Sequence, residues 1–203
     1  MVDQATPSRV VLVDEDDARA ALLTEALREA GYDVVARLTG RDDMLSAVSR
    51  ARADVVLVDM DSPARDTLDS CASVTREQPT PIVFFARDSD SETIRRAVKA
   101  GVSAYVVDHM PEQRLRAILD VAIARFHEYQ SLRSELEETR TRLADRKDVE
   151  RAKALLMRAR GLDEQPAYEL LRSSAMKRRI TMGEAARLLL SAAEMLDSDS
   201  GEN

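Results

Sequence analysis

The sequence contains few of the residues on which disulfide-bonded and zinc-binding proteins depend. Its 203 residues include no tryptophan, one cysteine and two histidines. A single cysteine excludes an intrachain disulfide, and two isolated histidines give no basis for an imidazole metal site. We expect Cys71 to be a buried apolar group on a helix.

Signals for export or membrane insertion are also missing. No charged segment followed by an apolar run occurs near Met1, and no apolar run approaches the length that crosses a bilayer. Apart from possible self-phosphorylation, the sequence likewise offers no nucleophile paired with a base, no Gly-rich phosphate loop and no metal-ligand cluster that would suggest an enzyme. We therefore expect a cytoplasmic protein that is not an enzyme, requires no cofactor and has no membrane partner.

Charge is distributed unevenly along the chain. The formal net charge is −7, but residues 1–128 hold 16 basic against 23 acidic side chains, whereas residues 146–196 hold 11 against 7. A chain of this length has room for one medium domain and a smaller one. An acidic controlling domain joined to a basic effector is one arrangement that predicts this asymmetry, because a polyanion such as RNA requires a local cationic surface. The alternative is that acidic domains are common and that the basic balance of the later segment is modest.

Residues 9–110 alternate five apolar runs with amphipathic segments. The runs are RVVLV, DVVAR, ADVVLVD, PIVFFA and SAYVVD, and helical patterns lie between them at about 18–30, 42–51, 66–77 and 91–100. This alternation predicts an α/β domain with a five-stranded, parallel, doubly wound sheet. Sheets of this type carry their functional residues at the carboxyl ends of the strands.

Acidic side chains gather at those predicted strand ends. Glu15 and Asp16 follow the first run, Asp59 closes the third, and Asp61 comes shortly after. Converging carboxylates would suit Mg²⁺, and Asp59 has the position of an aspartyl nucleophile. With VLVDEDD, VVLVDMDSP and AGVSAYVV in this order, residues 8–127 resemble the receiver domain of two-component response regulators. The resemblance implies that Glu15, Asp16 and Asp59 bind the metal and that Asp59 is the phosphoacceptor.

The switch positions of a receiver are altered in this chain. Ala86 stands where receivers place Ser or Thr, Asp108 where they place Lys, and His109 where they place Pro. Tyr105 is the remaining switch position. A Lys would offset phosphoryl charge, whereas a carboxylate would repel it. We therefore expect a degenerate pocket with an inherited phosphoacceptor, in which phosphorylation is disfavoured. Two arginines are candidates for compensating the charge: Arg65 and Arg87.

One helical pattern runs from Pro111 to Gly161 without an internal Gly or Pro. Its apolar positions step mostly by three and four: Leu115, Leu119, Ala122, Phe126, Tyr129, Leu132, Leu136, Thr139 and Leu143. Within residues 128–145 they form a heptad seam surrounded by charges, so we predict a coiled coil that joins two copies in a parallel homodimer. The competing interpretation is packing of this helix against its own domains.

Residues 146–196 have the pattern of three short helices, and residues 197–203 form an acidic tail that we expect to be disordered. The helix ends carry favourable cap residues: Gly161 after the first, Asp163 before the second, and Thr181 with Glu184 before the third. We therefore expect a compact helical unit near the end of the chain.

The second of these helices carries two stripes of side chains that differ in character. One stripe, mostly apolar, passes through Ala167, Leu170, Leu171 and Ser174. The other alternates cations with an aromatic ring and a thioether: Tyr168, Arg172, Met176 and Arg179. Such a surface suits a nucleobase beside a phosphate. Further cations would extend it: Lys153, Arg158, Lys177 and Arg178. The alternative, which helical spacing leaves open, is that Tyr168 and Met176 are core residues and the arginines a solvated surface.

ERAKALLM followed by DEQPAYELLRSSAMKRRITMGEAARLLL resembles the ANTAR domain, the RNA-binding module of the AmiR/NasT antitermination regulators. Ala154 departs from the Gly of the family's Ala-Lys-Gly at a position where Ala is the better helix former. The resemblance implies binding to paired hairpins of leader mRNA, which prevents a terminator from forming.

The order of SAYVVD, ILDVAIARF, LRSELEETRTRLA and ERAKALLM is similar to that of NasT-type members. That resemblance implies an antiterminator for nitrate and nitrite assimilation genes, restrained by a nitrate-sensing (NasS-like) partner protein more than by a kinase. Three alternatives stay open: a phosphorylation-controlled RNA binder, a DNA-binding transcription factor with a helix-turn-helix, and an interaction module that binds neither nucleic acid.

Overall fold

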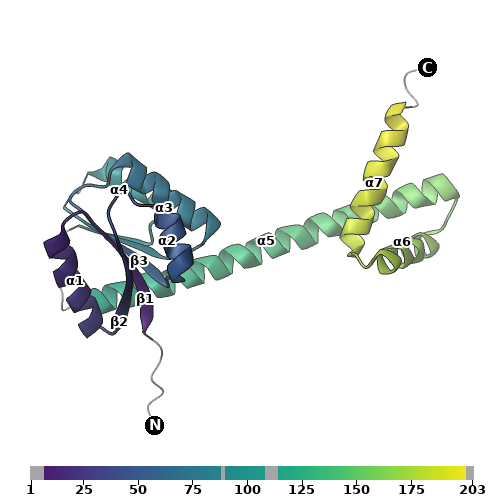
Figure 1. Cartoon of the computed structure of the whole chain (residues 1–203). Helices are drawn as coiled ribbons and strands as arrows, with labels where there is room; N and C mark the ends of the chain where they lie inside the picture. The colour runs from purple at the N-terminus through teal and green to yellow at the C-terminus, as the bar shows by residue number, and fades with distance from the viewer. Residues whose placement is uncertain (1–6, 88–89, 108–113, 200–203) are drawn as a thin grey trace, which may run out of the picture. The chain divides into compact units, whose positions relative to one another are not determined.

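The computed structural model describes residues 7–87, 90–107 and 114–199 (Figure 1). Two compact units divide the chain, the first reaching to Gln130 and the second beginning at Ser131. Within the described residues, no helix combines the length and the apolar composition that a membrane span needs.

The first unit is built on a five-stranded parallel sheet with the order β2-β1-β3-β4-β5. Its strands are β1 (Ser8–Asp14), β2 (Tyr32–Leu38), β3 (Val55–Asp59), β4 (Ile82–Ala86) and β5 (Ala104–Val107). The predicted doubly wound α/β fold is therefore confirmed. The three central strands are buried apolar runs because helices cover both of their faces.

Helices cover the two faces of this sheet and make two cores. They are α1 (Asp17–Glu29), α2 (Met44–Ala51), α3 (Arg65–Glu77), α4 (Ser91–Lys99) and the start of α5 (Leu115–Arg160). Residues of α1 and α5 pack on one face, and residues of α2, α3 and α4 on the other. Cys71 of α3 is fully buried, as expected, and burial raises the pKa of its thiol to about 12.

The second unit contains the later part of α5, α6 (Glu164–Arg178) and α7 (Met182–Asp199). As predicted, α5 ends before Gly161, which has a left-handed φ of 62°. Five buried alanines and two leucines make one core between the three helices: Ala152, Leu156, Ala167, Leu171, Ala175, Ala185 and Ala186. The chain therefore forms the expected compact helical unit.

Of the two N-caps predicted in this unit, one makes side-chain hydrogen bonds and the other does not. The carboxylate of Glu184 accepts a hydrogen bond from the backbone N–H of Thr181 at 2.8 Å, and the Thr181 hydroxyl accepts one from the Glu184 N–H at 3.2 Å. The capping box is thus confirmed. Asp163 occupies the N-cap position of α6, but its side chain makes no capping hydrogen bond there. Residues 197–199, expected in the disordered tail, continue the helix α7, because extending a formed helix is easier than nucleating one.

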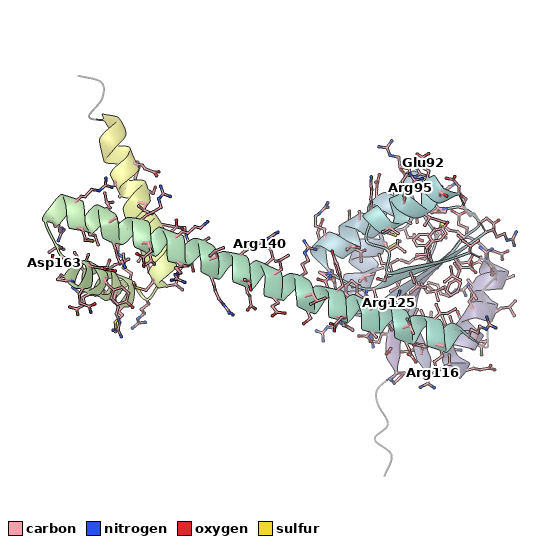
Figure 2. The ribbon with its side chains drawn as sticks, turned by 180° about the vertical axis from the view of Figure 1, so that it is seen from behind. Glu92, Arg95, Arg116, Arg125, Arg140 and Asp163 are labelled. Carbon is pink, nitrogen blue, oxygen red and sulfur yellow. The ribbon has the colours of Figure 1, made fainter. Side chains whose placement is uncertain are left out.

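The apolar positions of α5 are buried only along the first part of the helix. Leu115, Leu119, Ala122 and Phe126 lie in or beside the core of the first unit, at 8% exposure or less. All side chains from 131 to 144 are exposed, including those of Leu132, Leu136 and Leu143. Arg140, labelled in Figure 2, belongs to this stretch and pairs with Glu137 at 3.3 Å. The coiled coil stays a prediction, and these exposed leucines are the residues it would bury.

Candidate nucleic-acid interface and receiver pocket

The two stripes of α6 differ in exposure as well as in composition. Ala167 and Leu171 of the predicted apolar stripe are buried at 3% exposure or less, but Leu170 of that stripe is 36% exposed. In the other stripe Tyr168 is 38% and Met176 68% exposed. Arg172 is exposed between them. The alternative interpretation of Tyr168 and Met176 as core residues therefore does not hold. An aromatic ring, a guanidinium and a thioether follow one exposed side of the helix.

Three cations gather at the carboxyl end of α6, where they also complement the helix dipole. Lys177, Arg178 and Arg179 are all exposed. Arg179 is the C-cap residue, and its φ of 56° lies in the left-handed region that glycine normally occupies. Lys177 is nine residues from Tyr168, so it lies roughly on the opposite side of the helix. Arg158 is exposed in the last turn of α5.

Lys153, which the sequence placed among the RNA-contacting cations, is held inside the second unit. Its residue exposure is 8%, and its Nζ donates to Glu164 of α6 at 2.7 Å and to Glu150 of α5 at 3.0 Å. These carboxylates, Glu164 first, raise the pKa of the Lys153 ammonium. The described geometry therefore gives Lys153 the role of joining α5 to α6.

A second junction in the same unit could not be predicted from the sequence. Arg187 of α7 pairs with Asp145 and Asp148 of α5, the second at 3.7 Å. The Asp145 carboxylate also approaches Gly183 so closely that a Cβ there would collide with it. Because the pairing spans 42 residues, helical spacing within one segment could not reveal it. The two junctions fix α6 and α7 on α5.

In the first unit the strand register identifies an acidic residue that sequence analysis overlooked. Asp14, the last residue of β1, lies directly beside Asp59 of β3. Its side chain is fully buried, whereas Glu15 and Asp16 are exposed. Asp16 is the N-cap of α1, where its carboxylate accepts from the N–H groups of Ala18 and Arg19. These hydrogen bonds lower the pKa of Asp16.

Arg19 of α1 extends into this acidic group. Its Nε and Nη2 donate to the two oxygens of Asp14 at 2.9 and 2.7 Å. The same guanidinium lies 3.4 Å from an Asp59 oxygen and 3.7 Å from an Asp61 oxygen. The pKa of Arg19 is raised, mainly by the hydrogen bonds to Asp14. A pocket of about 280 Å³ opens beside it, lined by Glu15, Asp16, Arg19, Met60, Asp61, Ser62, Ala64 and Thr67.

The two arginines proposed to compensate charge differ in position. Arg87 lies 3.2 Å from Asp61, whereas Arg65 pairs with Asp69 at 3.9 Å. Among the switch positions, Ala86 is buried at the end of β4, and Tyr105 stacks on Phe84 with ring centroids 5.9 Å apart. The switch position Asp108 and the neighbouring His109 lie outside the described residues.

Mg²⁺ requires several oxygen ligands in nearly octahedral geometry. Here a guanidinium lies among Asp14, Asp59 and Asp61, and Asp16 is engaged in capping α1. Within the described ranges, no group of three or more His, Cys, Asp or Glu residues is arranged to hold a metal ion. The residues as arranged therefore do not fit the divalent ion that the sequence led us to consider.

Known proteins match both units of the chain. The ANTAR domain model matches residues 137–190, and the response regulator receiver domain model matches residues 10–120. The transcriptional regulatory protein PdtaR of Mycobacterium tuberculosis is 32% identical over 188 residues, which cover 93% of this chain and 92% of PdtaR. The DNA-binding response regulator MtrA of Mycolicibacterium smegmatis is 29% identical over 109 residues, which cover 54% of this chain and 47% of MtrA.

Solved structures match the receiver fold. The signal receiver domain of a modulated diguanylate cyclase from Desulfovibrio desulfuricans has a TM-score of 0.53 at 25% identity and covers 61% of this chain and 98% of its own. The chemotaxis response regulator CheY4 of Vibrio cholerae has a TM-score of 0.50 at 22% identity and covers 58% of this chain and 99% of its own. These likenesses concern the fold.

Proposed function

The chain belongs to the response regulators that join a receiver domain to an ANTAR domain, and we propose that it regulates transcription by binding RNA through α6. The observation that carries the proposal is the exposure of Tyr168 and Met176 beside Arg172, while the neighbouring Ala167 and Leu171 are buried. A ring beside a guanidinium offers stacking to a base and charge to a phosphate.

The proposed ligand is a pair of small hairpins in a leader mRNA, and its binding in the cytosol would prevent a terminator from forming. Hairpin loops present unstacked bases, which duplex stems do not. A homodimer through residues 128–145 would offer one α6 surface to each hairpin. The exposed leucines of that stretch support this assembly, because a helix of such polarity is marginal without a partner.

Control by a partner protein is proposed in preference to control by phosphorylation. Ala86 lacks the hydroxyl of a receiver switch residue, and Arg19 already contacts the carboxylates around Asp59. The nitrate and nitrite assimilation genes and the NasS-like sensor come from the resemblance to NasT-type members. We expect one sensor protein to bind the chain without nitrate and to be released by it. A beryllofluoride adduct that increases RNA affinity would instead favour phosphorylation control.

A DNA-binding function has one observation in its favour. The helices α6 and α7 are separated only by residues 179–181, a connection as short as that of a helix-turn-helix. That motif reads the major groove with side chains of its second helix, whose exposed residues near the start here include Glu184 and Arg187. Competition between duplex DNA and leader hairpins for the same protein distinguishes the two functions.

Replacing Arg172 by Ala tests the proposed surface. We expect hairpin affinity about tenfold weaker and a slope of log K against log salt lower by about 1. Arg125, exposed on the first unit and labelled in Figure 2, provides a charge-matched control, and Arg125→Ala should leave both quantities unchanged. Fluorescence anisotropy with a labelled hairpin pair measures them. Equal affinities for wild type and Arg172→Ala would place the RNA surface elsewhere.

A further inference from the structure

We propose that the guanidinium of Arg19 occupies the place of a divalent cation among Asp14, Asp59 and Asp61, so that the receiver pocket takes up Mg²⁺ only when that guanidinium is removed. The proposal rests on the geometry of the first unit and is independent of RNA binding by α6. It concerns four side chains that the strand register and the start of α1 bring together.

The first support is the pair of hydrogen bonds that Arg19 donates to Asp14. Both oxygens of this carboxylate accept from Arg19, at 2.7 and 2.9 Å, in the two-point geometry that makes arginine–carboxylate pairs strong. The Asp14 side chain is fully buried, so its charge needs a partner inside the protein. Mg²⁺ would have to displace a cation that already satisfies this carboxylate.

The second support is the position of the same guanidinium relative to the neighbouring acids. Its Nη2 lies 3.3 Å from the backbone oxygen of Asp59, and its Nε lies 3.4 Å from the Asp59 side chain. Its Nη1 lies 3.7 Å from Asp61. One planar group thus reaches three acidic residues, and a guanidinium and a metal ion cannot occupy the same space.

The third support is the anchoring of Arg19 itself. Its backbone N–H donates to the carboxylate of Asp16 at 3.1 Å, within the cap that begins α1. The side chain is only 27% exposed. Because the guanidinium is covalently attached to a backbone position that the cap holds in place, its local concentration at the carboxylates is high. A free ion therefore competes with it at a disadvantage.

Arg87 provides a matched control within the same pocket. It approaches Asp61 to 3.2 Å, but its side chain is 57% exposed and that of Asp61 65%. It therefore adds positive charge at the rim of the pocket, beside Asp61. If Mg²⁺ were excluded only by nearby positive charge, removing Arg87 would admit the ion about as well as removing Arg19.

The experiment titrates full-length wild type, Arg19→Met and Arg87→Met with Mg²⁺ at constant ionic strength, by calorimetry and thermal melting. We expect Arg19→Met to bind Mg²⁺ at least about tenfold more tightly than wild type, a usual size for coupled sites, and to melt at a higher temperature when the ion is present. Arg87→Met should behave as wild type does. Equal Mg²⁺ affinity in wild type and Arg19→Met, or an equal gain in Arg87→Met, would overturn the proposal.

Arg19→Met leaves the Asp14 carboxylate buried without its partner and can therefore prevent folding. A direct measurement on the wild type covers that case. Titration with Mn²⁺ followed by electron paramagnetic resonance should show no saturable site tighter than about 1 mM, the weak end of carboxylate sites. A tighter site that Asp59→Asn abolishes would overturn the proposal whatever the variant does.

Discussion

Two arginines, Arg52 and Arg179, have left-handed backbone conformations at the ends of α2 and α6, with φ of 47° and 56°. For a residue with a Cβ this conformation costs about 1 kcal/mol or more relative to the usual one. Glycine would be the stable choice at both positions. Of the two, only Arg179 belongs to the proposed RNA surface, at the carboxyl end of α6.

Replacing Arg179 by Gly should therefore separate stability from function. We expect a gain of up to about 1 kcal/mol in the free energy of unfolding, because glycine relieves the left-handed strain. Hairpin affinity should fall, since a cation of the proposed RNA surface is lost. Chemical denaturation and anisotropy measure the two effects.

Arg52→Gly is the matched control for this substitution. It relieves the same kind of strain at the end of α2, in the first unit, and removes the same charge. We expect a similar gain in stability with unchanged RNA affinity. A loss of affinity in both variants would assign the effect to net charge, not to the position of Arg179.

Lys153 allows a prediction of the opposite kind. Because its ammonium joins Glu150 and Glu164 within the second unit, Lys153→Met should lower the melting temperature. At a temperature where the variant is fully folded, its hairpin affinity should equal that of wild type. A large loss of affinity without a loss of stability would restore Lys153 to the set of RNA-contacting residues that the sequence indicated.

At the level of helices and strands, most boundaries followed from the sequence. The apolar runs located the strands, Gly161 located the end of α5, and Thr181 with Glu184 located the start of α7. Each of these signals is local. The Asp163 side chain shows the limit of such signals, since the residue is at the N-cap but makes no capping hydrogen bond.

The candidate sites were predicted less completely, because their contacts join distant segments. Asp14 became recognisable only through its register with Asp59, 45 residues away. Arg19 falls within the helical pattern predicted at about 18–30, and its contact with Asp61 could not be predicted because it depends on how α1 begins. The exposure of Tyr168 likewise required the packing of α6 on α5, which periodicity alone left open.

The exposed seam of α5 leads to a prediction about assembly. We expect the chain to be a dimer at micromolar concentration and Leu136→Lys to shift it to monomer, because a charge would enter the apolar seam. Leu22 of α1, also exposed, is the control, and Leu22→Lys should remain dimeric. Sedimentation velocity measures both. A monomeric wild type at this concentration, with or without RNA, contradicts the coiled coil.

Over the whole molecule, charge separates the two units in a way that suits their proposed roles. The first 128 residues are acidic on balance and the segment 146–196 is basic, although the chain as a whole carries −7. Binding of a polyanion should therefore depend on the local surface of the second unit. The salt dependence of RNA affinity is the quantity that tests this.

The central claim is that the second unit recognises hairpin RNA, and direct binding of the full-length chain tests it most simply. A two-hairpin leader RNA and a duplex DNA of equal charge are titrated at about 50 mM and about 200 mM salt. We expect the RNA to bind more tightly at both concentrations and Arg172→Ala to remove most of that preference. Equal affinity for the two nucleic acids, or no RNA binding at the lower salt concentration, would contradict the account.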